Sequence, residues 1–176
     1  WLSLCCFRRF GSRARARIVS SRPSSRRTPL GARGGSKTLG SALFVAHVLK
    51  VFAEHPRVTG ANAFKFLDRL PNGWIGVRDG KFVPKAPLYA LRMFSRHFGT
   101  TLLRTLTSSP GYDSRSIGWV DAAPSVPYLE SVASYDDEGK LYVLMINKHF
   151  DRNLRVQLLL HDYCPSGSAK VWTLGG

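Results

Sequence analysis

The acidic residues are the first candidates for chemistry, because two carboxyl groups held close together can supply a nucleophile and a proton donor. Glu54 lies at the end of a predicted helix, and Glu130 begins a predicted strand. Asp136, Asp137 and Glu138 stand together in a predicted turn. The predicted elements do not bring two of these acids to a common cleft, so we interpret them as solvated surface charges. We therefore assign no catalytic residue to the chain.

The cysteines and histidines do not form a metal-binding pattern. Cys5 and Cys6 are adjacent, Cys164 is alone, and the sequence has no C-x-x-C pair or Cys/His cluster. We predict no metal site, no disulfide framework and no cofactor. His47 and His97 fall on predicted helices, where a core or surface position is the ordinary interpretation.

The positive charge is concentrated at the N-terminus. The formal net charge is +15, and residues 1–37 contain ten basic residues and no acid, which leaves 16 basic residues against 11 acids in residues 38–176. Residues 1–37 mix Arg, Ser, Gly and Pro without hydrophobic periodicity, so we predict a disordered tail. The tail suits a basic arm for nucleic acid, a targeting peptide or non-native sequence from a misread frame. Its abrupt end at Thr38 favours the last.

The next segment alternates helix and strand. Residues 38–55 carry apolar side chains on more than one face, which predicts a helix that is largely buried. Residues 57–67 predict a strand. A short hairpin within residues 74–83 and a second helix over residues 85–98 follow. Helix, strand and helix in this order are typical of a barrel built from βα units, and residues 38–99 would be its end.

After Gly99 the apolar period changes from helical to alternating. Strands are predicted over residues 100–107, 128–135, 140–147, 153–160 and 169–174. The predicted fold class is therefore α/β plus all-β: the terminal βα unit of a (β/α)8 barrel followed by an antiparallel β-sandwich. We expect the sandwich of residues 100–176 to be incomplete, because such a domain usually needs another strand or two. The longest apolar stretch has 13 residues and is too short for a membrane span of roughly 20.

Four segments resemble family 51 glycoside hydrolases, the α-L-arabinofuranosidases. TLGSALFVAHVLKVFAE (residues 38–54) resembles the helix after the seventh barrel strand, and VTGANAFKFLD (58–68) is similar to the eighth strand. PLYALRMFSRHFG (87–99) looks like the final barrel helix. YVLMINKHFDRNLRV (142–156) looks like a strand–turn–strand of the C-terminal sandwich. The four segments follow the family's order.

The resemblance implies a retaining hydrolase that removes terminal arabinofuranosyl units from plant polysaccharides. Such chemistry uses two carboxyl groups about 5 Å apart, one as nucleophile and one as acid/base. In the family they follow barrel strands four and seven, and both positions would precede Thr38. The chain thus looks like the C-terminal fragment of a glycosidase without its two catalytic carboxylates. The implied partners are a polysaccharide or oligosaccharide substrate and the missing N-terminal portion of the barrel.

The resemblance also places substrate-binding candidates at the end of the eighth strand. Lys65, three residues after Asn62, stands where arabinofuranosidases often carry Gln. Lys65 is cationic and a donor only, which puts the substrate in doubt; it could instead pair with Asp68 or face solvent. Trp74 follows in the next loop and could stack on a sugar, although packing between barrel and sandwich is the commoner role for such a residue.

Two functions of other classes stay open. One is a non-catalytic carbohydrate-binding or structural β-sandwich. The other is nucleic-acid binding through the basic tail, against which the scarcity of aromatic residues in the tail argues. The sequence leaves the sugar, the linkage and the oligomeric state undetermined. The compartment, cytoplasmic or secreted, also stays open, since no signal peptide is recognisable.

Overall fold

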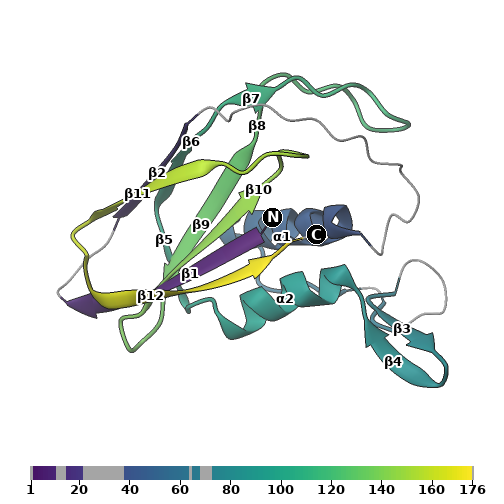
Figure 1. The fold of residues 1–176 in the computed structure, drawn as a ribbon, viewed down its shortest axis with the longest axis horizontal. Coiled ribbons are helices and arrows are strands. Elements are labelled where there is room, and N and C mark those ends of the chain that lie inside the picture. The colour runs from purple at the N-terminus through teal and green to yellow at the C-terminus, as the bar shows by residue number, and fades with distance from the viewer. Residues whose placement is uncertain (1, 11–14, 22–37, 64, 68–72, 176) are drawn as a thin grey trace.

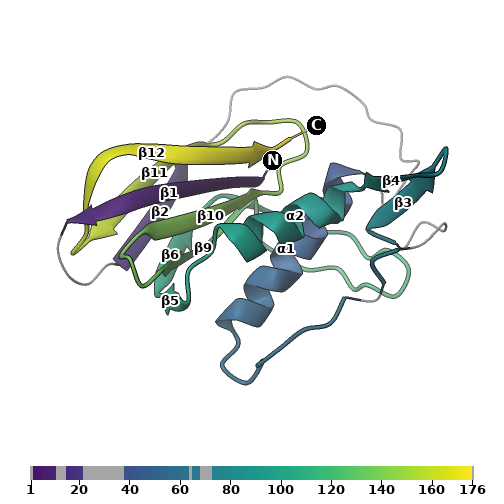
Figure 2. The ribbon, with the colours of Figure 1, turned by 90° about the horizontal axis from the view of Figure 1, so that it is seen from below.

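The computed structural model describes residues 2–10, 15–21, 38–63, 65–67 and 73–175. In residues 7–10 and 15–21 and at residue 167 only the backbone is described. The described chain consists mainly of β-strands, with two helices packed against one sheet (Figures 1 and 2). Within this part of the chain, neither helix is long and apolar enough to cross a membrane.

The larger sheet has five strands and lies at the centre of the fold. Its order is β12-β1-β10-β9-β5, and every neighbouring pair is antiparallel. The strands are β1 (Leu2–Phe10), β5 (Thr101–Leu103), β9 (Leu129–Tyr135), β10 (Leu141–Asn147) and β12 (Cys164–Leu174). The predicted strands over residues 128–135, 140–147 and 169–174 are thus confirmed.

The smaller sheet has three strands in the order β11-β2-β6. These are β2 (Arg15–Ser21), β6 (Thr105–Ser108) and β11 (Arg155–His161). The predicted strand over residues 100–107 is divided between the two sheets, because the chain leaves β5 at Leu103 and enters β6 at Thr105. A further short pair, β7 (Gly111–Tyr112) and β8 (Val126–Pro127), closes a long loop between β6 and β9.

The central strands β9 and β10 are buried on both faces. Val132, Leu144 and Ile146 face the helices, where they form a cluster with helix residues. Ala133, Val143 and Met145, one position away on each strand, lie in the second cluster with residues of the smaller sheet. Since successive side chains of a strand point to opposite faces, a strand covered on both sides has a continuous apolar sequence. This explains the run LYVLMIN in β10.

The prediction of a disordered tail is wrong for residues 2–10 and 15–21. Strand β1 lies between β10 and β12, with Leu4 paired to Leu144 on one side and Trp172 on the other. Leu2 and Leu4 are fully buried in the helix-facing cluster. The short alternation of Leu2, Ser3, Leu4 and Cys5 fits a strand, but the Arg-rich average over 37 residues obscures it. Residues 11–14 and 22–37 lie outside the described residues.

These two N-terminal strands also change the picture of the sandwich. Residues 100–176 were expected to need another strand or two. The structure takes β1 into the larger sheet and β2 into the smaller one, where β2 is antiparallel to β11 but parallel to β6. The prediction of an antiparallel arrangement is therefore wrong for the β2–β6 pair. The sandwich is therefore built from both ends of the chain, and its extra strands come from residues 2–21.

The two predicted helices are confirmed as α1 (Leu39–Glu54) and α2 (Ala86–Arg96), which pack on each other and on the larger sheet (Figure 2). The expectation that the first helix is largely buried is wrong. Within α1 only Ala42 and Ala46 are buried, whereas Phe44 is 68% exposed. Small residues let α1 lie close to α2 and the sheet. Leu39, Leu43 and Val45 pack partly buried against the same cluster, whereas Phe44, Val51 and Phe52 are exposed.

The strand predicted over residues 57–67 is not formed. Its described part carries no strand except a single parallel bridge between Leu67 and Ile75, and residues 57–62 are exposed. A strand needs a neighbour for its backbone hydrogen bonds, and among the described residues the segment meets a sheet only at its end, where Leu67 bridges Ile75 of the hairpin. The unit of a (β/α)8 barrel is therefore not shown by this structure.

The hairpin after this segment is formed as predicted. Strands β3 (Ile75–Arg78) and β4 (Lys81–Pro84) are antiparallel and joined by Asp79 and Gly80. Both turn residues have positive φ, 51° and 73°. An Asp-Gly pair favours this two-residue turn because both residues tolerate the left-handed region.

At the end of α2, the chain passes very close to the larger sheet at Gly99. A Cβ atom on Gly99 would lie 2.2 Å from the carbonyl carbon and oxygen of Tyr135. The backbone nitrogen of Gly99 also donates a 2.8 Å hydrogen bond to the buried Ser134 hydroxyl. This residue therefore ties the helical layer to β9 where no side chain fits.

Candidate functional site

The predicted substrate-binding residues lie on the irregular segment between α1 and the β3–β4 hairpin. Asn62 is exposed, and Lys65 is half-buried. Asp68, the alternative partner of Lys65, lies outside the described residues, so that pairing stays a prediction.

Trp74 is partly buried and packs against Phe66. The two ring centroids are 5.4 Å apart, and the planes meet at 76° in an edge-to-face contact. The carbonyl oxygen of Trp74 accepts a 2.9 Å hydrogen bond from the backbone nitrogen of Lys85, just before α2. Trp74 thus joins the segment of residues 65–67 to the hairpin and α2, and its contact is with Phe66.

The carboxylates of the described residues serve mainly as hydrogen-bond acceptors and salt-bridge partners. Asp136 accepts hydrogen bonds from the Tyr142 hydroxyl at 2.9 Å and from the backbone nitrogen of Lys140 at 2.9 Å. The Asp136 carboxylate and burial raise the pKa of Tyr142, burial being the larger cause. Asp137 accepts from Thr100 at 3.3 Å. These bonds fix the β9–β10 turn, as expected for acids in a turn.

The interpretation of Glu130 as a solvated surface charge is wrong, because its side chain is only 13% exposed and connects β9 to α1. Its Oε1 lies 2.5 Å from Lys148 Nζ, and its Oε2 lies 2.7 Å from His47 Nδ1 and 3.9 Å from Lys50 Nζ. Lys50 also bonds Glu54 at 2.7 Å. Burial acts to raise the pKa of Glu130, but the hydrogen bonds and charges of Lys148 and His47 outweigh it and lower the pKa below its ordinary value.

We call Glu130, His47, Lys50 and Lys148 the Glu130 joint. Three of the four side chains are well covered, with exposed fractions of 13% for Glu130, 15% for Lys50 and 18% for Lys148. A carboxylate held ionised among cations is a poor proton donor, so the joint is suited to holding the helix on the sandwich and not to general acid catalysis.

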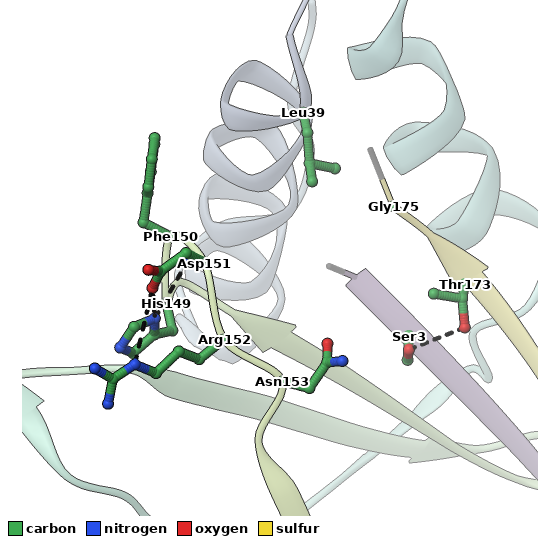
Figure 3. Close-up of a pocket in the computed structure, with 9 residues that line it drawn as sticks. All are labelled: Ser3, Leu39, His149, Phe150, Asp151, Arg152, Asn153, Thr173 and Gly175. Atoms are coloured by element: carbon green, nitrogen blue, oxygen red, sulfur yellow. Dashed lines mark hydrogen bonds and ion pairs between the residues drawn. The ribbon is translucent and has the colours of Figure 1, made fainter. Parts of the chain in front are cut away.

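A pocket of about 580 Å³ opens at one end of the sandwich (Figure 3). It lies where the start of β1 and the end of β12 meet the loop after β10 and the start of α1. Its lining residues are Ser3, Leu39, His149, Phe150, Asp151, Arg152, Asn153, Thr173 and Gly175. We call it the end pocket; none of the substrate-binding residues predicted from sequence lines it.

Asn147 holds the loop that forms one wall of the end pocket. It is fully buried, its side-chain amide donates a 2.8 Å hydrogen bond to the carbonyl of Arg152, and its Oδ1 accepts one from the nitrogen of His149 at 2.9 Å. His149 Nδ1 lies 3.2 Å from Asp151 Oδ1, and Arg152 Nε lies 3.9 Å from the same oxygen. The loop therefore presents a carboxylate between two cationic or polar partners.

The described residues contain no group of three or more His, Cys, Asp or Glu side chains that could hold a metal ion. Cys5 and Cys6 lie on β1 and Cys164 begins β12. Burial raises the pKa of Cys5, and also that of Cys6, so neither thiol is activated as a nucleophile.

The chain is similar to two fungal arabinofuranosidases. It is 27% identical over 140 residues to a probable alpha-L-arabinofuranosidase C of Aspergillus terreus. The aligned region covers 79% of this chain and 27% of that protein. It is 25% identical over 142 residues to a probable alpha-L-arabinofuranosidase C of Aspergillus niger, covering 80% of this chain and 27% of that protein. Neither a protein-family model nor a solved structure matches this chain.

This similarity indicates a distant relationship to alpha-L-arabinofuranosidases. The chain spans about a quarter of the length of the curated relatives it matches, as 27% is covered in both. The relationship is therefore one between this chain and a part of those proteins.

Sequence reasoning did not single out the Glu130 joint or the end pocket. His47, Lys50 and Glu54 are spaced i, i+3 and i+7, which places them along one helix face and was a readable signal of a polar contact. The polar run of residues 148–153 after an apolar strand was a second signal. What could not be read from sequence is that Glu130 on β9 and Lys148, the residue after β10, both face that helix.

Proposed function

We propose that this chain is part of a retaining glycoside hydrolase of the family 51, α-L-arabinofuranosidase type, which removes terminal arabinofuranosyl units from plant polysaccharides. The observation that carries the proposal is the similarity over 140 residues to the Aspergillus terreus arabinofuranosidase. In this proposal the two helices belong to the end of a barrel, and the sandwich is the domain that follows it.

The exposed apolar residues of the helical layer support the proposal. On α1 and the segment after it, large hydrophobic side chains are at least a third exposed; these are Phe44, Val51, Phe52, Val58, Phe66 and Leu67. Large apolar side chains left exposed along one segment suggest that another part of a protein packs there. The upstream barrel strands and helices of a glycosidase would cover it and give residues 57–67 the neighbours that a strand needs.

The catalytic carboxylates would come from that upstream part. Retaining hydrolysis needs a nucleophile and an acid/base about 5 Å apart. Of the acids described above, Glu130 is held ionised by Lys148 and His47, and Asp136 is engaged by Tyr142 and Lys140. This chain would instead supply binding residues, with Lys65 and Asn62 at the edge of the sugar pocket and Trp74 beside them.

A fusion protein tests the proposal. The 176-residue chain replaces the matched C-terminal segment of the Aspergillus terreus relative, and release of 4-nitrophenol from 4-nitrophenyl α-L-arabinofuranoside is measured. We expect hydrolysis by the fusion and none by the truncated relative or by the chain alone. A fusion that unfolds cooperatively yet hydrolyses no arabinofuranoside would contradict the proposal.

Lys65 gives the same experiment a residue-level readout. We expect Lys65→Ala in the fusion to lower kcat/KM by roughly tenfold, because a polar group that binds the sugar is lost, and Lys65→Gln to retain most of the activity. Lys81→Ala, on the exposed turn of the β3–β4 hairpin, is the matched control. Equal losses for the Lys65→Ala and Lys81→Ala fusions would remove Lys65 from the sugar pocket.

A further inference from the structure

The end pocket has the size and the chemistry of a ligand site. Its volume of about 580 Å³ falls within the roughly 300–1,000 Å³ of ligand pockets. The proposed hydrolysis does not use it, because none of its lining residues is among those assigned to the sugar pocket of the barrel. It therefore needs an explanation of its own.

The charges around the end pocket favour a neutral ligand. Asp151 and Arg152 are the two oppositely charged residues of the lining, and their charges cancel. A phosphate or carboxylate ligand would need an excess of positive charge, which this lining does not provide. A cation would need an excess of acids or a set of oxygen ligands, and Asp151 already has His149 and Arg152 beside it.

The polar groups of the lining suit a ligand with many hydroxyl groups. The Ser3 and Thr173 hydroxyls, which lie 3.1 Å apart, can each donate and accept hydrogen bonds. Asp151 is an acceptor, Arg152 is a donor, and the Asn153 amide is both. Sugar hydroxyls also donate and accept, so a short carbohydrate matches this mixture better than an apolar ligand does.

An aromatic side chain stands at the same place. Phe150 is 71% exposed, and in Figure 3 its ring projects outward from the loop that carries His149, Asp151 and Arg152. An exposed aromatic face next to hydrogen-bonding groups is the arrangement that binds the C–H face of a sugar ring while its hydroxyls are bonded at the rim.

The loop that carries His149, Phe150, Asp151 and Arg152 is held in place by contacts within the protein. The buried Asn147 bonds both His149 and Arg152. The His149 ring also packs against Tyr128 with centroids 4.5 Å apart, and Tyr128 packs against Tyr112 at 5.0 Å. A preformed wall of this kind lowers the ordering cost of binding.

We propose that the end pocket is an accessory binding site for a neutral oligosaccharide, separate from the hydrolytic site. The choice of an arabinose-containing glycan rests on the proposed function; the preference for a neutral sugar rests on the pocket itself. In an enzyme acting on a polysaccharide, such a site would hold the polysaccharide near the barrel and raise its local concentration there.

Binding of arabinopentaose to the full 176-residue chain tests the site. The chain is carried on a fusion partner that does not bind sugars, and binding is followed by calorimetry and by the ring-proton NMR signals of His149. We expect saturable binding that shifts the His149 signals and leaves those of His161, which lies outside the pocket, unchanged. Inorganic phosphate at the same concentration should produce neither effect.

Variants localise the site. We expect Asp151→Ala and Phe150→Ala each to weaken arabinopentaose binding by roughly fivefold or more, since a charged hydrogen-bond acceptor and an aromatic contact are lost. Phe82→Ala is the matched control, because Phe82 is also 71% exposed but lies on the β3–β4 hairpin. Unchanged melting temperatures of the variants would exclude loss of folding as the cause.

Three results would overturn the proposal. They are the absence of saturable binding up to the solubility limit of the sugar, binding of phosphate in place of the sugar, and binding that survives both pocket variants. Loss of binding in Trp119→Ala alone would place the sugar on the loop of residues 113–125, where Trp119 is fully exposed, and would also refute the end pocket. The hydrolysis assay of the fusion is independent of these outcomes, so failure of the pocket and failure of the proposed function are told apart.

Discussion

Strand β10 and helix α1 have similarly apolar sequences but very different surroundings. In β10 every side chain from Val143 to Asn147 is buried, because the helices cover one face of the sheet and the smaller sheet covers the other. In α1 only two alanines are buried, and Phe44 is 68% exposed. Apolar composition thus shows that a segment is meant to be covered, but the partner that covers it decides whether it is.

The difference divides the described molecule into a part whose central apolar side chains are covered and a part that leaves large apolar side chains exposed. The sandwich receives its strands from both ends of the chain and closes two apolar clusters. The helices pack one face against the larger sheet and leave apolar side chains on their other face exposed. In the proposed function this exposed face is the surface against which the upstream barrel packs, and mutations on the two faces should therefore have unequal effects.

The largest effect is expected from Leu144→Ala in β10. Leu144 is fully buried in the helix-facing cluster, so its truncation should lower the free energy of unfolding by about 2–5 kcal/mol. Phe44→Ala, on the exposed side of α1, removes a larger side chain but should change the free energy of unfolding by only about 0.5 kcal/mol. Urea unfolding of both variants measures the difference, and equal losses would show that Phe44 is covered in solution.

The same pair of variants sharpens the comparison in the fusion with the Aspergillus terreus relative. There the barrel should bury Phe44, so Phe44→Ala should become clearly destabilising while the effect of Leu144→Ala stays as it was. If Phe44→Ala remains neutral in the fusion, the open face of α1 is not the barrel contact.

Both helices, the β3–β4 hairpin and the strands over residues 128–147 could be predicted from sequence, since their patterns are local. The Asp79-Gly80 turn is an example, because two residues specify it. Strand β1 could not be predicted in the same way. Its pairing with residues 141–146 and 164–174 lies far away in the sequence, and the many arginines of the tail hide four residues of alternation.

The error over residues 57–67 has the opposite cause. The alternation there is suited to a strand, but a strand forms only beside another, and in the described structure the segment meets another strand only through the Leu67–Ile75 bridge at its end. The candidate site shows the same limit. Asn62, Lys65 and Trp74 were placed by resemblance, whereas the Glu130 joint and the end pocket depend on which loops and faces meet, which no local pattern encodes.

Glu130→Gln is expected to have an intermediate effect. The amide keeps the shape but loses the charge that Lys148 and His47 bond, so the helical layer should be held less firmly on the sandwich. The free energy of unfolding should fall by about 1–2 kcal/mol, less than for breaking a fully buried pair because His47 is 41% exposed. Glu54→Gln, whose carboxylate bonds Lys50 at a more exposed position, is the matched control.

The dependence of stability on acidic pH gives a second test of the role of Glu130. The pKa of Glu130 is lower in the folded chain than its ordinary value of 4.5, so its contribution is present above pH 4.5 and is lost as the pH falls through the folded pKa. The wild-type chain should therefore lose stability below pH 4.5 faster than Glu130→Gln does. Parallel curves of melting temperature against pH for the two proteins would show that Glu130 does not hold the layers together.

The smallest effect is expected where the end of α2 meets β12. The His97 ring stacks on Trp172 with centroids 4.1 Å apart, and burial, together with the charges of Arg96 and Arg92, lowers the pKa of His97 below its ordinary value of 6.5. The unfolded chain then takes up a proton more readily, so stability should decrease as the pH falls through 6.5 and level off below the folded pKa. His97→Phe should keep the stacking and remove this step, whereas His161→Phe, at the exposed end of β11, should leave it in place. Melting curves on either side of pH 6.5 for the wild-type chain, His97→Phe and His161→Phe measure this step, and equal pH dependence in all three proteins would show that His97 does not cause it.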